Sequence, residues 1–167
     1  MIETARPAGE DDVPRIAELV EEAIAELVPT RGGELWAARE ARAVPAHESL
    51  AKAVADPRQL LLAGEIDGVV VGYAAVRLEE LRTGETLGVV DDIFVEPPAR
   101  GVAVGELLMD AALAWCEEQG CIGVDSYALP GNRDTKNFFE RFGLTARAII
   151  VHRRLRRDGD AGRPESR

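Results

Sequence analysis

One stretch, residues 86–109, constrains the fold most, because it combines a buried strand, a forced stop and the start of a helix. Apolar, β-branched and aromatic residues at 89–95 favour a buried strand. The prolines at 97–98 lack the amide hydrogen that a sheet ladder needs, so the strand must end before them. The small residues of 100–105 then lead into apolar positions at helical spacing over 107–115. The sequence therefore predicts a strand–loop–helix unit in the middle of the chain.

This unit is suited to bind an anion. A helix that starts directly after a loop of small residues presents unpaired backbone N–H groups and the positive end of its dipole. A tight turn used only for packing is an equally good explanation. The loop is not a P-loop, because no Lys-Ser/Thr follows Gly105. It is also a poor dinucleotide-binding fingerprint, since the glycine spacing differs and two strands are expected before it.

The segment from Asp91 to Leu108 resembles the acetyl-CoA-binding segment of the GCN5-related N-acetyltransferases. The family pattern there is Arg/Gln-x-x-Gly-x-Gly/Ala, and Arg100, Val104 and Gly105 fit it. Ala103 stands where the family usually has glycine. Alanine is the smallest possible replacement, so close approach of a pyrophosphate should survive unless that position needs a positive φ.

A second block, residues 132–144, is similar to the family pattern Asn-x-x-Ala-x-x-Phe-Tyr-x-x-x-Gly-Phe. Asn132, Phe138 and Gly143 match it, whereas Phe139 replaces the tyrosine. The two blocks are in the family's order, separated by one helix and one strand, so together they are far more specific than either alone. The resemblance extends over about residues 2–155.

The expected fold is the α/β acyl-CoA N-acyltransferase fold, with a mixed central sheet flanked by helices. The patterns predict an antiparallel meander, then one parallel strand reached by a right-handed helical crossover. The chain is read as a single domain over 1–157, followed by a disordered tail at 158–167. The expected strands are 2–6, 59–65, 69–78, 89–95, 121–128 and one or two strands in 144–155; the expected helices are 12–27, 34–43, 46–55, 103–119 and 133–142.

The resemblance implies a set of cofactor-binding residues that hold acetyl-CoA mainly through main-chain groups. They are Ile93, Phe94, Val95, Arg100, Gly101, Val102, Ala103, Val104, Gly105, Glu106, Asn132, Thr135 and Phe139. Asn132 can contact the pantetheine arm, cap its helix, or do both.

The candidate catalytic residues are Asp91, Asp92 and Tyr127. A carboxylate beside the central strand could take the proton of the attacking amine, and Asp91 is the first choice because the resemblance puts it at an acidic position of the family. Adjacent strand residues face opposite ways, so one of the two aspartates is expected to point into the site. Phe139 cannot protonate a leaving thiolate; Tyr127, water, or unaided departure of the thiolate remain as alternatives.

The implied function is direct transfer of an acetyl group from acetyl-CoA to a primary amine of a small molecule or peptide. The alternative is a non-catalytic acyl-CoA-binding regulatory module on the same fold, for which the missing tyrosine and glycine are the support. The formal net charge of −10 argues against nucleic acid and anionic membranes as partners. No metal site, signal sequence or membrane span is expected, and Cys116 and Cys121 fit free thiols in a reducing cytoplasm. The apolar run 148–151 suggests a paired strand edge and a possible homodimer.

Overall fold

The computed structural model describes residues 1–155, and the tail expected at 158–167 lies outside the described residues. The strands are β1 (Glu3–Pro7), β2 (Gln59–Ile66), β3 (Val69–Glu80), β4 (Thr86–Val95) and β5 (Val124–Ser126). They form one sheet in the order β1-β2-β3-β4-β5. Neighbours are antiparallel except β4 and β5, which are parallel. The expected meander and crossover are therefore confirmed.

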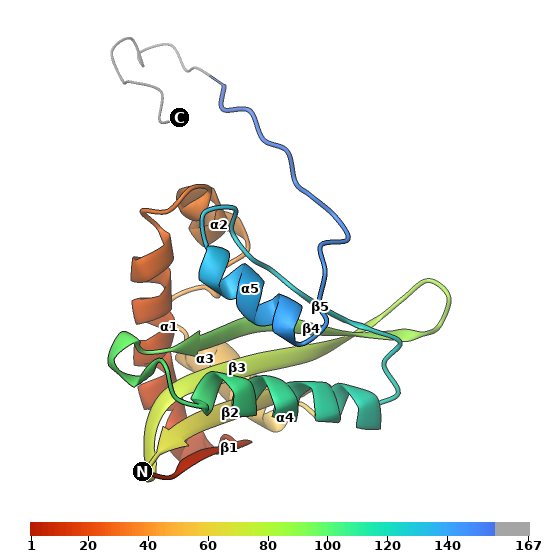
Figure 1. Cartoon of the computed structure of the whole chain (residues 1–167). Coiled ribbons are helices and arrows are strands. Elements are labelled where there is room, and N and C mark those ends of the chain that lie inside the picture. The colour runs from red at the N-terminus through yellow and green to blue at the C-terminus, as the bar shows by residue number, and fades with distance from the viewer. Residues whose placement is uncertain (156–167) are drawn as a thin grey trace.

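The α-helices are α1 (Val13–Leu27), α2 (Gly33–Arg39), α3 (His47–Ala55), α4 (Val104–Glu118) and α5 (Arg133–Arg141). Two short 3₁₀ turns, η1 (Glu10–Asp12) and η2 (Pro97–Ala99), precede α1 and the loop before α4. Helices α1 and α3 cover one face of the sheet, and α4 covers the other (Figure 1). The fold is thus a three-layer arrangement with the sheet in the middle.

Strand alternation explains the two cores. Tyr73 and Ala75 of β3 face α1 and α3, whereas Ala74 and Val76 face α4. Helix α4 lies close to the sheet at Gly64 of β2, where a Cβ atom would come within 3.0 Å of α4 side chains. Burial of both sheet faces accounts for the continuous apolar runs of β2 and β3.

The β2–β3 turn and the first helix agree with the sequence. Asp67 and Gly68 have φ values of 49° and 81°, the two positive values that a type I′ turn requires. Helix α1 carries a buried stripe at helical spacing, and Pro14 lies in its first turn.

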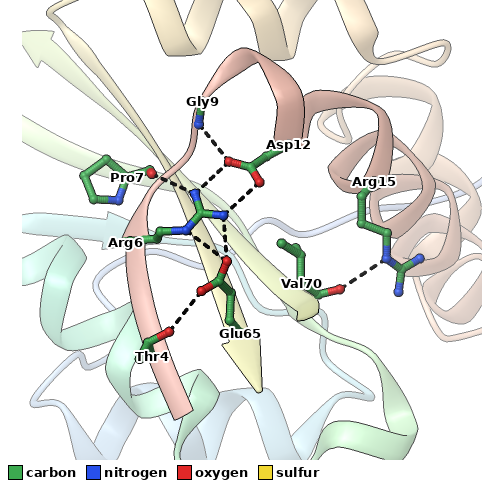
Figure 2. Close-up of polar contacts among 8 residues, drawn as sticks. All are labelled: Thr4, Arg6, Pro7, Gly9, Asp12, Arg15, Glu65 and Val70. Atoms are coloured by element: carbon green, nitrogen blue, oxygen red, sulfur yellow. Dashed lines mark hydrogen bonds and ion pairs between the residues drawn. The ribbon is translucent and has the colours of Figure 1, made fainter. Parts of the chain in front are cut away.

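An ion-pair cluster ties β1, η1 and β2 together at one edge of the molecule (Figure 2). We call Arg6, Asp12 and Glu65 the N-terminal cluster. The Arg6 guanidinium lies 2.7 Å from Asp12 and 2.6 Å from Glu65. The Gly9 N–H also donates to Asp12, at 2.8 Å. These hydrogen bonds hold the pKa of Asp12 below its usual value.

Two expectations at the end of the chain are wrong. The strand expected at 121–128 is reduced to the three residues of β5, and no strand forms within 144–155. The second segment is extended and exposed, with Ile149 at 84% and Val151 at 89%. Its apolar, β-branched composition favours a strand, but strand propensity describes fit to a neighbouring strand, and this segment has none within residues 1–155.

Candidate functional site

Strands β4 and β5 diverge beyond their first three paired positions. The pairing ends where Val90 lies opposite Ser126, whose hydroxyl donates to the Val90 carbonyl at 3.0 Å. From residue 91 to 95, β4 is paired on one side only, with β3. Backbone groups on its other side are therefore open to an extended ligand. The predicted cofactor-binding residues Ile93, Phe94 and Val95 lie there, although the Val95 carbonyl already accepts from Arg100 Nε at 2.8 Å.

The loop from β4 into α4 presents a row of free donors. No backbone N–H from residue 101 to 106 donates a hydrogen bond to any group in the described part of the chain. Gly101 takes the sharp turn with φ +86°. Ala103 has φ −73°, which suits alanine, so replacing the family's usual glycine costs no backbone strain. The loop and the first turn of α4 therefore retain the geometry of an anion site.

The side chains around this loop contact other parts of the protein and fix the loop in place. The Arg100 guanidinium pairs with Glu26 at 2.7 Å and lies 5.3 Å from the centre of the Phe94 ring. Val104 is fully buried against the sheet, while Val102 is half-buried. At these positions, therefore, any ligand contact would be made chiefly by the backbone.

Helix α5 lies over the first turn of α4. Asn132 caps α5, because its side chain accepts from the Thr135 N–H at 3.2 Å. The Phe138 ring lies 3.5 Å from the place where Gly105 would carry a Cβ. Phe139 is buried, with only 6% of its surface exposed. Glu106 also contacts α5, since its carboxylate lies 3.4 Å from Arg141.

A β-bulge in β4 places both aspartates on one side of the sheet. In the register, Asp92 lies opposite Ala75 and Val90 opposite Val76, so Asp91 is an extra residue without its own partner. The expectation that one aspartate alone could face the site is therefore wrong, because it assumed regular alternation. Asp91 pairs with Arg77, which shares a strand face with Ala75.

The two aspartates have different surroundings. Asp92 pairs with Arg42 at 2.7 Å, and both side chains are nearly buried, with 11% and 13% exposed. Asp91 lies 3.0 Å from Arg77 and is more open, with 34% exposed. Burial raises the pKa of Asp91 above its usual value, and Arg77 opposes that shift only in part. We call Arg42, Arg77, Asp91 and Asp92 the acceptor-side cluster.

Arg42 is the residue of this cluster that the sequence did not indicate. It comes from the segment between α2 and α3, and its guanidinium also donates to the Ser49 hydroxyl at 3.1 Å. Fifty residues separate it from Asp92, and no local spacing signals such a pairing. The ion pair fastens the segment between α2 and α3 to the central strand β4.

Tyr127 follows β5 and is 55% exposed. No hydrogen bond joins it to Asp91 or Asp92 in residues 1–155. It lies near Arg147, which forms a bidentate pair with Asp125 that includes a 2.8 Å hydrogen bond from Nε. The structure thus brings the two aspartates together, and Tyr127 directly follows Ser126, which pairs with Val90.

The described residues contain no group of three or more His, Cys, Asp or Glu side chains that could hold a metal ion. Within residues 1–155, every helix is too short or too polar to cross a membrane. Cys116 and Cys121 are both free thiols, and burial raises the pKa of Cys116 to about 12.

Comparison with known sequences places these features in a family. The model of the "Acetyltransferase (GNAT) family" matches residues 18–144, about three quarters of the chain. A mycothiol acetyltransferase of Propionibacterium freudenreichii is 30% identical over 90 residues, which are 54% of this chain and 28% of that protein. An aminoglycoside N(6')-acetyltransferase type 1 of Stenotrophomonas maltophilia is 34% identical over 79 residues, 44% and 52% of the two chains. The matched parts thus span about half or less of these relatives' own lengths.

Solved structures agree on the fold. The tetramutant of the BH1408 protein from Bacillus halodurans superposes with a TM-score of 0.78 at 19% identity, over 93% of this chain and 100% of that one. AAC(6')-Iy, solved in complex with the bisubstrate analogue CoA-S-monomethyl-acetylneamine, gives a TM-score of 0.71 at 17% identity, over 93% of this chain and 99% of that one. At such identities the likeness concerns the arrangement of the chain.

Proposed function

Because the chain belongs to the acetyltransferase (GNAT) family, we propose that it transfers the acetyl group of acetyl-CoA directly to a primary amine of a small molecule or peptide. The observation that carries this proposal is the combination of three features at β4. Its one-sided edge lies next to a helix start with six free N–H donors, and a desolvated carboxylate lies on the same strand.

The residues fit acetyl-CoA in two places. The free donors of 101–106 and the α4 dipole suit the pyrophosphate. The open backbone edge of 91–95 suits the amide-bearing pantetheine arm, which can pair as a strand does. Gly105 has no side chain, so a ligand can come close to the loop backbone there. The bound cosubstrate supplies a thioester carbonyl that an amine can attack.

Asp91 is the proposed base. Transfer forms a C–N bond, breaks the C–S bond and requires the amine to lose a proton. A carboxylate with a raised pKa is a better proton acceptor than an ordinary aspartate, and Asp91 has that property. It takes the proton directly or through one water. Asp92 is paired with Arg42 and serves to position the segment between α2 and α3 beside the amine.

The thiolate leaves as coenzyme A with a proton from solvent or from Tyr127. Phe139 supplies none, since it has no hydroxyl. The formal net charge of −10 is compatible with a cationic acceptor before it loses its proton. We further propose that the protein works in the cytoplasm, where acetyl-CoA and reduced thiols are available.

The test is release of free thiol from acetyl-CoA in the presence of a panel of primary amines. Amine-dependent release with formation of the acetylated product supports the proposal. Tight binding of coenzyme A with no amine-dependent release across small-molecule and peptide amines would instead support the regulatory module.

Cofactor binding is tested separately by calorimetry on Gly105→Asp and Gly105→Ala. The aspartate puts a negative charge at the free donors, so we expect affinity for coenzyme A to fall at least about tenfold, or 1.4 kcal/mol. The alanine Cβ would meet its nearest neighbour at an ordinary 3.5 Å, so that variant should bind as the wild type does. Equal affinity of all three proteins would contradict the assignment of the loop.

A further inference from the structure

The end of α4 brings the two cysteines of the chain together, where the chain turns back towards β5 (Figure 1). Gly120 ends the helix in the left-handed conformation, with φ +73°. The Gly120 N–H donates to the Glu117 carbonyl and the Cys121 N–H to the Cys116 carbonyl, both at 3.0 Å. This pair of hydrogen bonds is the Schellman motif, in which the residue after the glycine commonly contacts the residue five positions before it. Those two positions are here Cys121 and Cys116.

The two thiols differ in exposure. Cys116 is only 1% exposed and belongs to the core between α4 and the sheet, whereas Cys121 is half-buried and packs against that core. Burial is the largest cause of the raised pKa of Cys116, and the Cys121 thiol adds to it as a close neighbour. Solvent can therefore reach one cysteine, and the other lies behind it.

A hollow of about 230 Å³ at the surface leads to this pair. Both cysteines line it, together with apolar side chains that include Leu113, Ile122 and Val124. A water molecule takes up about 30 Å³ in the liquid, so the hollow has room for a molecule as small as a hydroperoxide. Such a molecule can reach Cys121 without any movement of the fold.

The Cys116 sulfur is also confined by β4. A Cβ atom at Gly88 would lie 2.5 Å from Cys116 Sγ, so a side chain at residue 88 would displace this thiol. Gly88 pairs with Val124 at the start of the parallel contact between β4 and β5. The backbone there bounds the Cys116 sulfur on one side and keeps it next to Cys121.

We propose that Cys116 and Cys121 form a redox-active pair, which a hydroperoxide converts into a disulfide within the chain. The Cys121 thiol gives up its proton, its sulfur attacks one peroxide oxygen, and the O–O bond breaks to leave a sulfenic acid and water or an alcohol. The Cys116 thiol then gives up its proton, and its sulfur attacks the Cys121 sulfur. The S–O bond breaks, the S–S bond forms, and the departing hydroxide leaves as water. Two thiols are oxidised and one peroxide is reduced.

Contact between the two sulfurs makes the second step possible. With a pKa of about 12, only about one Cys116 thiol in 10⁵ is ionised at pH 7, and such a thiol attacks slowly on its own. Groups held in contact react as if each were present at about 10⁵ M or more. The Schellman motif therefore offsets the low thiolate fraction. The proposal does not depend on the reaction that the protein catalyses.

The test treats the folded full chain with hydrogen peroxide and then blocks the remaining thiols with iodoacetamide. Glu117 and Glu118 lie between the two cysteines, so a protease that cleaves after glutamate separates them unless a disulfide joins the two peptides. We expect joined peptides from a protein that stays a single chain on a non-reducing gel. Dithiothreitol should separate them.

Two variants check the order of the steps. Cys116→Ala lacks the second thiol, so Cys121 should accumulate as a sulfenic acid that dimedone traps, at least about tenfold above the wild type. Cys121→Ala leaves only the buried thiol, which should stay reduced over the same time. Cys121 that stays reduced in Cys116→Ala would overturn the proposal, and so would Cys116 that is oxidised as fast in Cys121→Ala.

The wild type alone can also overturn the proposal. Both cysteines could stay reduced, or Cys121 could pass to the sulfinic acid while Cys116 remains a thiol. Either result would mean that the two sulfurs do not meet in the folded protein. Peptides joined only between two chains, or only after unfolding in urea, would contradict the proposal as well.

Discussion

The N-terminal cluster and the acceptor-side cluster both combine arginines with carboxylates, yet they shift the pKa of an aspartate in opposite directions. In the first, Asp12 accepts from Arg6 and a backbone N–H, and its pKa is lowered. In the second, Asp91 also contacts an arginine, but burial outweighs that contact and its pKa is raised. An arginine nearby therefore does not make a carboxylate structural. The balance between desolvation and hydrogen bonding separates a carboxylate that holds the fold from one that can accept a proton.

The sharpest test of this difference replaces one aspartate with asparagine in each cluster. Asp91→Asn should lower turnover by about 10²–10⁴-fold, the usual contribution of a positioned base. Affinity for coenzyme A should barely change, because the proposed contacts are made by the backbone. Single-turnover kinetics with the best amine from the panel measures the effect. Asp12→Asn is the matched control and should keep full turnover; full activity of Asp91→Asn across the pH range would remove Asp91 as the base.

In stability, we expect the opposite ranking of the two variants: Asp12→Asn should be destabilised and Asp91→Asn should not. The folded protein disfavours ionised Asp91, because its pKa is raised, so Asp91→Asn should leave stability at pH 7 equal or higher. Asp12→Asn should lower it by about 1 kcal/mol through loss of charged hydrogen bonds. Urea unfolding of the two variants measures both. A stabilised Asp12→Asn would mean that the N-terminal cluster is not a structural support.

Asp92 lies in the acceptor-side cluster, but its ion pair with Arg42 makes it a structural residue like Asp12. Asp92→Asn leaves Arg42 nearly buried without its partner, and we expect a loss of about 2–3 kcal/mol in stability. Arg42→Met/Asp92→Leu removes both charges and should recover most of it. Because Arg42 holds the segment between α2 and α3, which we propose shapes the amine site, the single variant should also raise KM for the amine more than it lowers kcat. A kcat loss as large as that of Asp91→Asn, with KM unchanged, would instead make Asp92 the base.

The smallest expected effects are shifts along the pH axis. Arg77 lowers the pKa of Asp91, so Arg77→Gln should move the acid limb of kcat/KM to higher pH. Arg6→Gln should leave that limb in place. Arg6→Gln should instead affect stability. Because the pKa of Asp12 is lowered in the folded protein, Asp12 stabilises the fold at pH values above the ordinary aspartate pKa. This stabilisation is lost as pH falls through the pKa of Asp12 in the folded protein. The variant should therefore be less stable than the wild type above the ordinary aspartate pKa, and this difference should shrink as pH falls through the folded value, as urea unfolding at several pH values would show. An acid limb unmoved in Arg77→Gln would mean that another group sets it.

The sequence predicted the parts of the fold that depend on local patterns. The crossover through α4 and the cap at Asn132 each follow from neighbouring residues. The bulge at Asp91 does not, because it depends on the register with β3. The pairing of Arg42 with Asp92 depends on how a loop packs, and the segment 144–155 depends on a neighbouring strand that its own composition cannot specify.

The bulge at Asp91 makes that residue an insertion into an otherwise regular ladder. Val90 and Asp92 already face opposite sides of the sheet, and their partners Val76 and Ala75 are consecutive. Removing Asp91 from the chain would therefore join two halves of β4 that are in phase, and every other side chain would keep its side. Few positions in a central strand can be deleted in this way, because a one-residue shift normally moves every following side chain to the opposite face of the sheet. The sheet would lose nothing it needs for folding, and the site would lose its proposed base.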